Sequence, residues 1–244
     1  MSHYWQEQTW TDVEQSKPDV VLLPVGSTEA HGPHLPLSTD SLISEEVSRR
    51  AAVDLAQQGV RTLILPSLHY AITEYSKDFS GTISISKESF QHVLLDIANS
   101  LSAQGIDVLC IVNSHLEPDH IGAIREFAEN YKRMTVLFPD KTKKPWGSLL
   151  TAEFKQGACH AGSYETSLVL AARENLVRKI HRQLPANPVN LATLMKQGVK
   201  TFREAGAGQA YFGDPAAATA EEGEETYRIL TRMIVETVLP AVRK

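Results

Sequence analysis

Short apolar runs alternate along the chain with longer segments of helical spacing. Four of these runs are rich in β-branched residues and leucine and end at turn residues; they cover residues 20–25, 61–65, 107–112 and 134–138. Near-continuous apolar runs of this length are typical of strands that are buried on both faces, as in parallel sheets. The pattern therefore predicts four strands of a mostly parallel sheet.

The segments between and after these runs predict helices. Apolar residues recur at three- and four-residue intervals in residues 42–55, 90–101, 121–128 and 221–238. This spacing places them on one face of a helix. Strands that alternate with helices imply right-handed crossovers, which cover both faces of the sheet. We therefore expect an α/β fold with three layers (αβα), a mostly parallel central sheet and a single domain over residues 1–244.

Charge and composition indicate which kinds of partner the chain can bind: nucleic acid, a membrane or a small molecule. The formal net charge is −5 and no long stretch is dense in Lys and Arg, which disfavours binding to nucleic acid. No stretch approaches the roughly 18 apolar residues of a membrane span, and the N-terminus lacks the apolar core of a signal peptide. Cys110 and Cys159 form neither a CxxC motif nor a disulfide framework. We expect a cytoplasmic protein with a small-molecule substrate and no nucleic-acid or membrane partner.

Candidate chemistry first appears after the first predicted strand. In open α/β sheets, ligands bind beyond the carboxyl ends of the strands. Residues 26–40 form a loop rich in Gly and Pro that carries Glu29, His31, His34 and Asp40. Glu29 and His31 are two residues apart, so in an extended backbone they point to the same side. Asp40 stands at the N-cap position of the next helix, and capping is an alternative explanation for it.

A second pair with the same spacing, His115 and Glu117, follows the third predicted strand. Two His/carboxylate pairs at equivalent strand ends, with one additional Asp, form a ligand set for a pair of metal ions. Imidazole and carboxylate ligands suit Zn²⁺, Mn²⁺ or Fe²⁺. We therefore expect two divalent metal ions per chain. The predicted ligands are Glu29, His31, Asp40, His115 and Glu117.

A third cluster contains Cys159, His160 and Glu165 and leads into an apolar helical segment. Ser163 in this cluster is a candidate helix start. We expect His160 to act as an acid/base or carbonyl-polarising group beside the metals. A nucleophilic Cys159 thiolate is disfavoured, because neighbours in sequence rarely point at one another and no second histidine is placed as its base.

Several motifs together resemble those of the creatininase family, which comprises creatinine amidohydrolase and its relatives. They are PVGSTEAHGPHLPL at residues 24–37, GTIS at 81–84, the motif around His115, HAGSYETS at 160–167 and FGDP at 212–215. The motifs occur in the family's order and span most of the chain. The resemblance implies a three-layer fold, a binuclear metal centre, hydrolysis of a non-peptide and often cyclic C–N bond, and commonly a homohexamer.

The resemblance also implies how the ligands are shared. Glu29 and His115 match the ligands of one metal, His31 and Glu117 match those of the other, and Asp40 bridges both. Some relatives lack the Glu two residues after the histidine, and in these another acidic residue must act as the metal ligand.

Glu165, the acid of the E-T-S element, is the candidate for that position. His160 matches the family histidine near the substrate. The residues with expected catalytic roles are therefore His160, Glu117 and Glu165.

The expected substrate pocket departs from that of creatinine hydrolases. Leu116 replaces their aromatic residue after the histidine, and Pro118 replaces the following Asn, so creatinine itself is disfavoured. Trp146 lies near the position of the family's aromatic substrate contacts, although a core or interface position is an equal alternative. The expected substrate contacts are therefore Leu116, Trp146 and His160.

These features predict an amidohydrolase that cleaves a non-peptide C–N bond. Two metal ions lower the pKa of a bridging water, whose hydroxide attacks the amide carbonyl, and His160 then passes a proton to the leaving nitrogen. The alternatives are a peptidase- or deformylase-type member of the family and a non-catalytic binding protein. A nucleotide substrate would need a phosphate site; Lys77, residues 141–144 and Arg203 are the candidates, but we expect them to be solvated surface residues.

Overall fold

The computed structural model describes residues 2–243 and contains the predicted sheet. β1 (Val20–Val25), β2 (Thr62–Ile64), β3 (Val108–Asn113) and β4 (Thr135–Leu137) are all parallel, in the order β2-β1-β3-β4. β2 and β4 are shorter than predicted because they lie at the sheet edges and pair with only part of the central strands. The ends of the predicted 1–244 domain, residues 1 and 244, lie outside the described residues.

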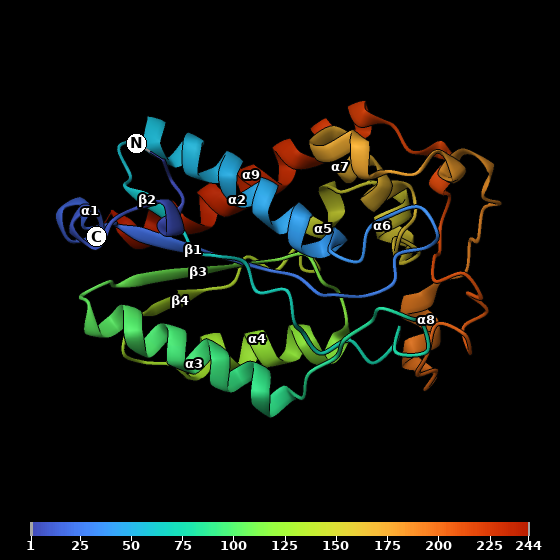
Figure 1. The fold of residues 1–244 in the computed structure, drawn as a ribbon, viewed down its shortest axis with the longest axis horizontal. Coiled ribbons are helices and arrows are strands. Elements are labelled where there is room, and N and C mark those ends of the chain that lie inside the picture. The colour runs from blue at the N-terminus through green and yellow to red at the C-terminus, as the bar shows by residue number, and fades with distance from the viewer. Residues whose placement is uncertain (1, 244) are drawn as a thin grey trace.

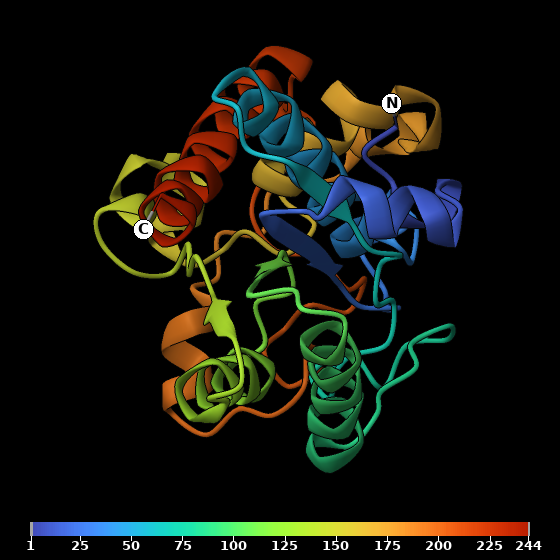
Figure 2. The same ribbon diagram turned by 90° about the vertical axis from the view of Figure 1, so that its left-hand side faces the viewer.

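Helices cover both faces of the sheet, which confirms the three-layer α/β fold. α2 (Thr39–Gln57) and α9 (Ala220–Val242) pack on one face together with α7 (Ser163–Arg173). α3 (Lys87–Ala103) and α4 (Pro118–Asn130) pack on the other. Figure 1 shows the two helical layers above and below the strands, and Figure 2 shows them from the end of the sheet.

Several shorter helices were not predicted, because one or two turns give too little periodicity to recognise. They are α1 (Trp10–Ser16), α5 (Trp146–Leu149), α6 (Ala152–Gln156), α8 (Leu191–Lys196) and the 3-10 helices Trp5–Glu7, Glu174–Leu176, Lys179–Gln183 and Pro215–Ala217. Within residues 2–243, no helix has both the length and the apolar character that crossing a membrane requires.

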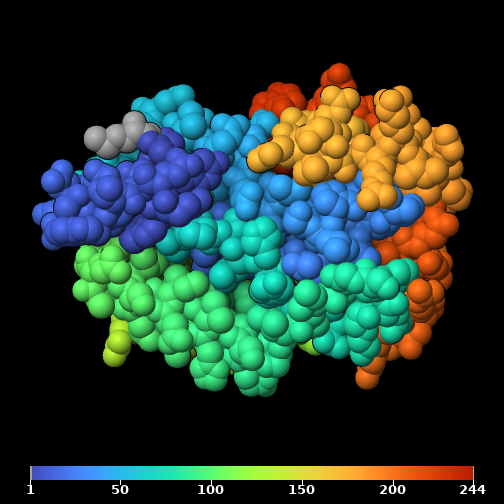
Figure 3. Space-filling view, viewed as in Figure 1, coloured from blue at the N-terminus to red at the C-terminus, as the bar shows by residue number. Residues whose placement is uncertain are grey.

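The sheet positions the site through the two central strands. β1 and β3 are neighbours, with Val25 beside Asn113 at their carboxyl ends. The chain leaves β1 toward α2 on one face and leaves β3 toward α4 on the other. Such a change of direction between adjacent strands opens a crevice where α/β proteins bind ligands. The connection between β2 and α3, coloured cyan to teal, crosses the surface between α2 and α3 (Figure 3).

Candidate metal centre

The loop after β1 lies tightly against the first turn of α2. A Cβ on Gly26 would lie 2.2 Å from the backbone nitrogen of Ser41, so only glycine allows this approach. The approach brings Asp40 under the loop, where the residue is 1% exposed and its carboxylate accepts a hydrogen bond from the Ser27 hydroxyl (2.8 Å). The N-cap of α2 is Ser38 and not Asp40. The prediction that Asp40 occupies the N-cap was therefore wrong, and its carboxylate is available to the site.

His115 reaches the same carboxylate from the end of β3. The side-chain amide of Asn113 donates to the backbone oxygen of His115 (2.6 Å) and so fixes this turn. Nδ1 of His115 lies 3.0 Å from Asp40 Oδ2 and 3.1 Å from Glu29 Oε1. The predicted convergence of the loops after β1 and β3 is thus present in the structure.

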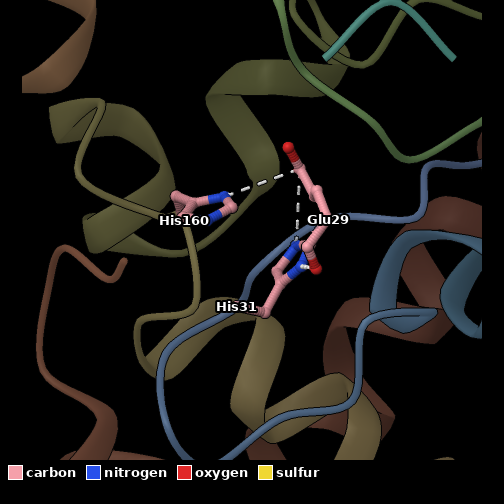
Figure 4. Close-up of side chains that lie close together, drawn as sticks. All are labelled: Glu29, His31 and His160. Atoms are coloured by element: carbon pink, nitrogen blue, oxygen red, sulfur yellow. Dashed lines mark hydrogen bonds and ion pairs between the residues drawn. The ribbon is translucent and has the colours of Figure 1, made fainter. Parts of the chain in front are cut away.

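The segment before α7 and the first turn of α7 supply the remaining side chains. His160 Nδ1 lies 3.9 Å from Glu29 Oε1, and both His160 and His31 point toward the Glu29 carboxylate (Figure 4). Glu165 lies in the first turn of α7, and its Oε2 is 3.5 Å from His31 Nε2. The backbone N–H of Ala161 donates to the same Glu165 oxygen (2.6 Å), which holds the carboxylate toward His31.

The three histidines are oriented as metal ligands are. Each has one ring nitrogen within hydrogen-bond distance of a backbone carbonyl: His31 Nδ1 with Glu29 (3.2 Å), His115 Nε2 with Ile72 (2.8 Å) and His160 Nε2 with Ala30 (2.9 Å). A carbonyl oxygen only accepts, so these nitrogens carry the proton and the other nitrogen presents its lone pair to the carboxylates. A lone pair that faces a carboxylate is repelled unless a cation or a second proton lies between them.

Charges in this cluster raise the pKa of His31 and lower the pKa of Glu29, so they favour the charged forms of both side chains. Burial alone would lower the pKa of His31, but the Asp40 carboxylate raises it to about 10. Burial alone would raise the pKa of Glu29, but the charge on His115 lowers it to about 2. The site therefore demands positive charge, which protons supply when cations do not.

The donor atoms form three overlapping groups, two of which share Asp40. Glu29, Asp40 and His115 form the first group, His31, Asp40 and Glu165 form the second, and Glu29, His31 and His160 form the third. Within each group the ligand atoms all lie within 4.8 Å of one another. The first two groups thus fit a pair of divalent cations, for which Asp40 would be a common ligand.

Glu117 is placed differently from the other predicted ligands. It precedes Pro118 at the start of α4, and its oxygens accept hydrogen bonds from the backbone N–H groups of Glu74 (3.0 Å) and Tyr75 (3.3 Å). Among the described residues it belongs to none of the three ligand groups, and Glu165 occupies the place that we expected for it. Burial raises the pKa of Glu117 to about 7 against the opposing charge of His115.

A cavity of about 520 Å³ opens over this cluster. Its floor contains acidic and imidazole groups, and much of its wall is apolar. The lining includes Glu29, Asp40, His115, Leu116, Glu117, His160 and Glu165, together with Tyr75, Phe154, Cys159, Leu191, Met195 and Phe202. Burial raises the pKa of Cys159 well above its ordinary value, so its sulfur stays a neutral thiol.

The structure does not place Trp146 in this lining. Its indole packs against the core on the α9 side, with the Arg232 guanidinium 6.0 Å from the ring centre. The following residues, Gly147 and Ser148, line the cavity in its place. The alternative core position that we kept for Trp146 therefore describes it better.

Several supporting residues were missed by sequence reasoning. The hydroxyls of Thr73 and Ser76 donate to Glu29 Oε2, and the hydroxyl of Thr82 accepts from the backbone N–H of Ala30 (3.1 Å). These three residues lie in the connection between β2 and α3, which has no repeating pattern. The GTIS motif, which includes Thr82, was the only signal in that segment.

The basic residues considered for a phosphate site differ in their contacts and in their burial. Lys77 pairs with Glu74, and Arg203 lies over the ring of Phe79. Lys141 was expected on a solvated surface, but it is 4% exposed and donates to the Ser114 hydroxyl (3.2 Å). That expectation was wrong because the chain turns inward beside β3 before it reaches α5.

Sequence comparisons identify the family of this chain and several of its relatives. The family model of creatininase (creatinine amidohydrolase) matches residues 6–238. The chain is 33% identical over 226 residues to the mycofactocin precursor peptide peptidase of Mycobacterium ulcerans, which covers 89% of this chain and 82% of that protein. It is 27% identical over 194 residues to the creatinine amidohydrolase of Pseudomonas putida, which covers 70% of this chain and 72% of that protein.

Solved structures share the fold. A mutant creatininase complexed with creatine superposes with a TM-score of 0.77 at 22% identity and covers 100% of both chains. Other creatininases of this fold include a manganese form and a zinc form. The fold therefore coincides over essentially the whole chain.

Proposed function

Because this chain belongs to the creatininase family, a family of hydrolases, we propose that it is a metal-dependent hydrolase that cleaves an amide bond in a short peptide or peptide-like molecule. The observation that carries this proposal is the pair of ligand groups that share Asp40 at the floor of a partly apolar cavity.

Glu29, Asp40 and His115 would hold one divalent cation, and His31, Asp40 and Glu165 would hold a second. When bound, they supply positive charge that polarises an amide carbonyl and makes a water molecule more acidic. Manganese and zinc both occur in creatininases of this fold, and both suit imidazole and carboxylate ligands.

His160 is the residue that handles the leaving nitrogen. Burial and the neighbouring charge of His31 lower the pKa of His160 to about 4, so its imidazole is neutral at neutral pH. Its Nε2 is hydrogen-bonded to the Ala30 carbonyl, and its Nδ1 presents a lone pair toward the Glu29 carboxylate at the floor. In this proposal, Nδ1 accepts a proton from the attacking water and passes it to the nitrogen that departs.

Glu117 is a second proton-handling group at the edge of the same floor. Its pKa of about 7 lies near the working pH of a general acid or base. The N–H groups of Glu74 and Tyr75 fix the carboxylate in place, so it needs no rearrangement before it exchanges a proton.

The choice of a peptide-like substrate departs from our preference at the sequence level. The sequence favours a non-peptide amide, often a cyclic one, with a peptidase as an alternative. Relatives named as peptide peptidases at 33% identity favour that alternative, and so does a cavity with apolar walls. A small cyclic amide stays the second candidate because of the similarity to creatinine amidohydrolase.

The test is hydrolysis of a panel of short peptides, cyclic amides and formamides by protein reconstituted with zinc or manganese. We expect amine release from the peptides, loss of that release on chelation and recovery on addition of metal. Release from the cyclic amides alone would select the second candidate. Silence across the panel with no metal bound would contradict the proposal and favour a non-catalytic binding protein.

A further inference from the structure

The main cavity has a basic rim that the reaction proposed above does not use. Lys143 and Lys144, from the loop between β4 and α5, and Lys155, from α6, line the cavity and are exposed. Across residues 2–243, the lysines that form ion pairs are Lys77 and Lys87. The three rim ammonium groups therefore have no carboxylate partner within the described chain.

The cavity also offers an apolar surface near the reacting groups. The ring of Phe202 lies 4.3 Å from the ring of His160, centre to centre. Leu191 and Met195 of α8 continue this apolar lining. A ligand that fills the cavity thus meets an apolar surface beside the floor and positive charge at the rim.

The sign of the potential in the cavity depends on the metal centre, so this inference rests on the proposed function. The floor contains the carboxylates of Glu29, Asp40, Glu117 and Glu165, which repel an anion when they are not compensated. Two divalent cations would balance four negative charges. The rim lysines would then make the cavity attractive to an anion on a chain whose formal net charge is −5.

We propose that the cavity selects amide substrates that carry an anionic group, either a carboxylate or a phosphate. Lys143, Lys144 and Lys155 bind this group, while an apolar part of the substrate lies against Phe202 and α8. Lysine ammonium groups are compact charges without the fixed fork of arginine, so they accept either anion.

The experiment is calorimetric titration of the metal-loaded protein with three probes. These are N-acetyl-L-phenylalanine, its neutral C-terminal amide and phenyl phosphate. We expect the acid to bind more tightly than the amide, by about threefold for each lysine that it engages. The triple variant K143Q/K144Q/K155Q should lose this preference, whereas K87Q/K132Q/K179Q, with the same change in charge at residues outside the cavity lining, should keep it.

The variants separate rim binding from direct binding to the ions, because a carboxylate that binds only the ions keeps its preference in K143Q/K144Q/K155Q. That result overturns the proposal, and so does the absence of a preference in the wild-type protein with both ions bound. Tighter binding of phenyl phosphate than of the acid identifies the anion as a phosphate, and the reverse identifies a carboxylate. Metal content is measured on the same samples, and its absence overturns the proposed function as well.

Discussion

At the scale of single residues, the centre is organised by histidines that are each fixed through one ring nitrogen. His31, His115 and His160 use backbone carbonyls for this purpose and turn the second nitrogen toward carboxylates. The same geometry distinguishes the two acids whose roles the sequence left open. Glu165 faces the ligand nitrogen of His31, whereas Glu117 is bound by backbone N–H groups.

We therefore predict different outcomes for two matched substitutions. Glu165→Gln should lose one of the two bound ions, because it removes a charged ligand from the group of His31 and Asp40. Glu117→Gln should keep both ions and lower kcat by about 10²–10⁴-fold, because it removes an acid/base group. Elemental analysis and steady-state kinetics on both variants test this assignment. A loss of metal in Glu117→Gln with full metal in Glu165→Gln would reverse the two roles.

Lys141 gives a prediction about stability and pH. Burial lowers its pKa from 10.5 to about 8, so between these values the unfolded chain binds more protons than the folded chain. Stability from this group therefore rises with pH across that window, and below it the cost of the buried charge is fully present. Lys141→Met should stabilise the protein near neutral pH by up to about 3 kcal/mol, and this gain should shrink toward the upper end of the window.

Denaturant unfolding at several pH values measures this effect. Lys132→Met, at an exposed position, is the control and should change stability little at any pH. Destabilisation by Lys141→Met near neutral pH would mean that the contact with Ser114 and the attraction of the nearby carboxylates outweigh the cost of burial.

The sequence predicted which types of residue form the centre more accurately than it predicted which of them contact one another. Glu29, His31, Asp40 and His115 were predicted together because they follow neighbouring strands of a parallel sheet. The place of Glu165 was open because α7 comes much later in the chain and its position depends on packing. Lys141 was misplaced, and two positions were left open for Trp146, because a short loop gives no periodicity from which the direction of its side chains can be inferred.

At the scale of elements, the centre depends on the contact between the end of β1 and the start of α2. Gly26 makes this contact without a side chain. Gly26→Ala should cost about 1–3 kcal/mol of stability, because the new Cβ has to push backbone apart. It should also weaken metal binding, because the same shift separates Glu29 from Asp40.

Gly122→Ala is the matched control. Gly122 lies inside α4, and a Cβ there meets no heavy atom within 4 Å. The substitution should stabilise the protein by about 0.5–1 kcal/mol because alanine is the better helix former. Thermal unfolding and metal titration of both variants test the contrast, and equal effects of the two substitutions would contradict it.

The long elements were predictable and the short ones were not. α2, α3, α4 and α9 have enough turns for an apolar stripe to repeat, and β1 and β3 are apolar at every position because both faces are covered. α8 and the connection between β2 and α3 are ordered by contacts with distant parts of the chain. These are the segments that complete the cavity, so its shape could not be derived from local pattern.

At the scale of the whole molecule, the fold brings the loops after β1 and β3 and the segment before α7 to one end of the sheet. One helical layer supplies Asp40 and Glu165, and the connection between β2 and α3 supports Glu29. The homohexamer and the cytoplasmic location that we expected from the sequence stay predictions. The ligand groups described above consist of residues of this chain.

The most direct test of the metal centre is the metal content of the purified, metal-reconstituted protein and of Asp40→Ala, measured by elemental analysis. Asp54→Ala is the control, because Asp54 is an exposed residue of α2. We predict two divalent ions per chain in the wild-type and control proteins. We also predict loss of both ions from Asp40→Ala, because Asp40 belongs to both groups that are proposed to hold them. Full metal content in Asp40→Ala, or no bound metal in the wild-type protein, would contradict these predictions.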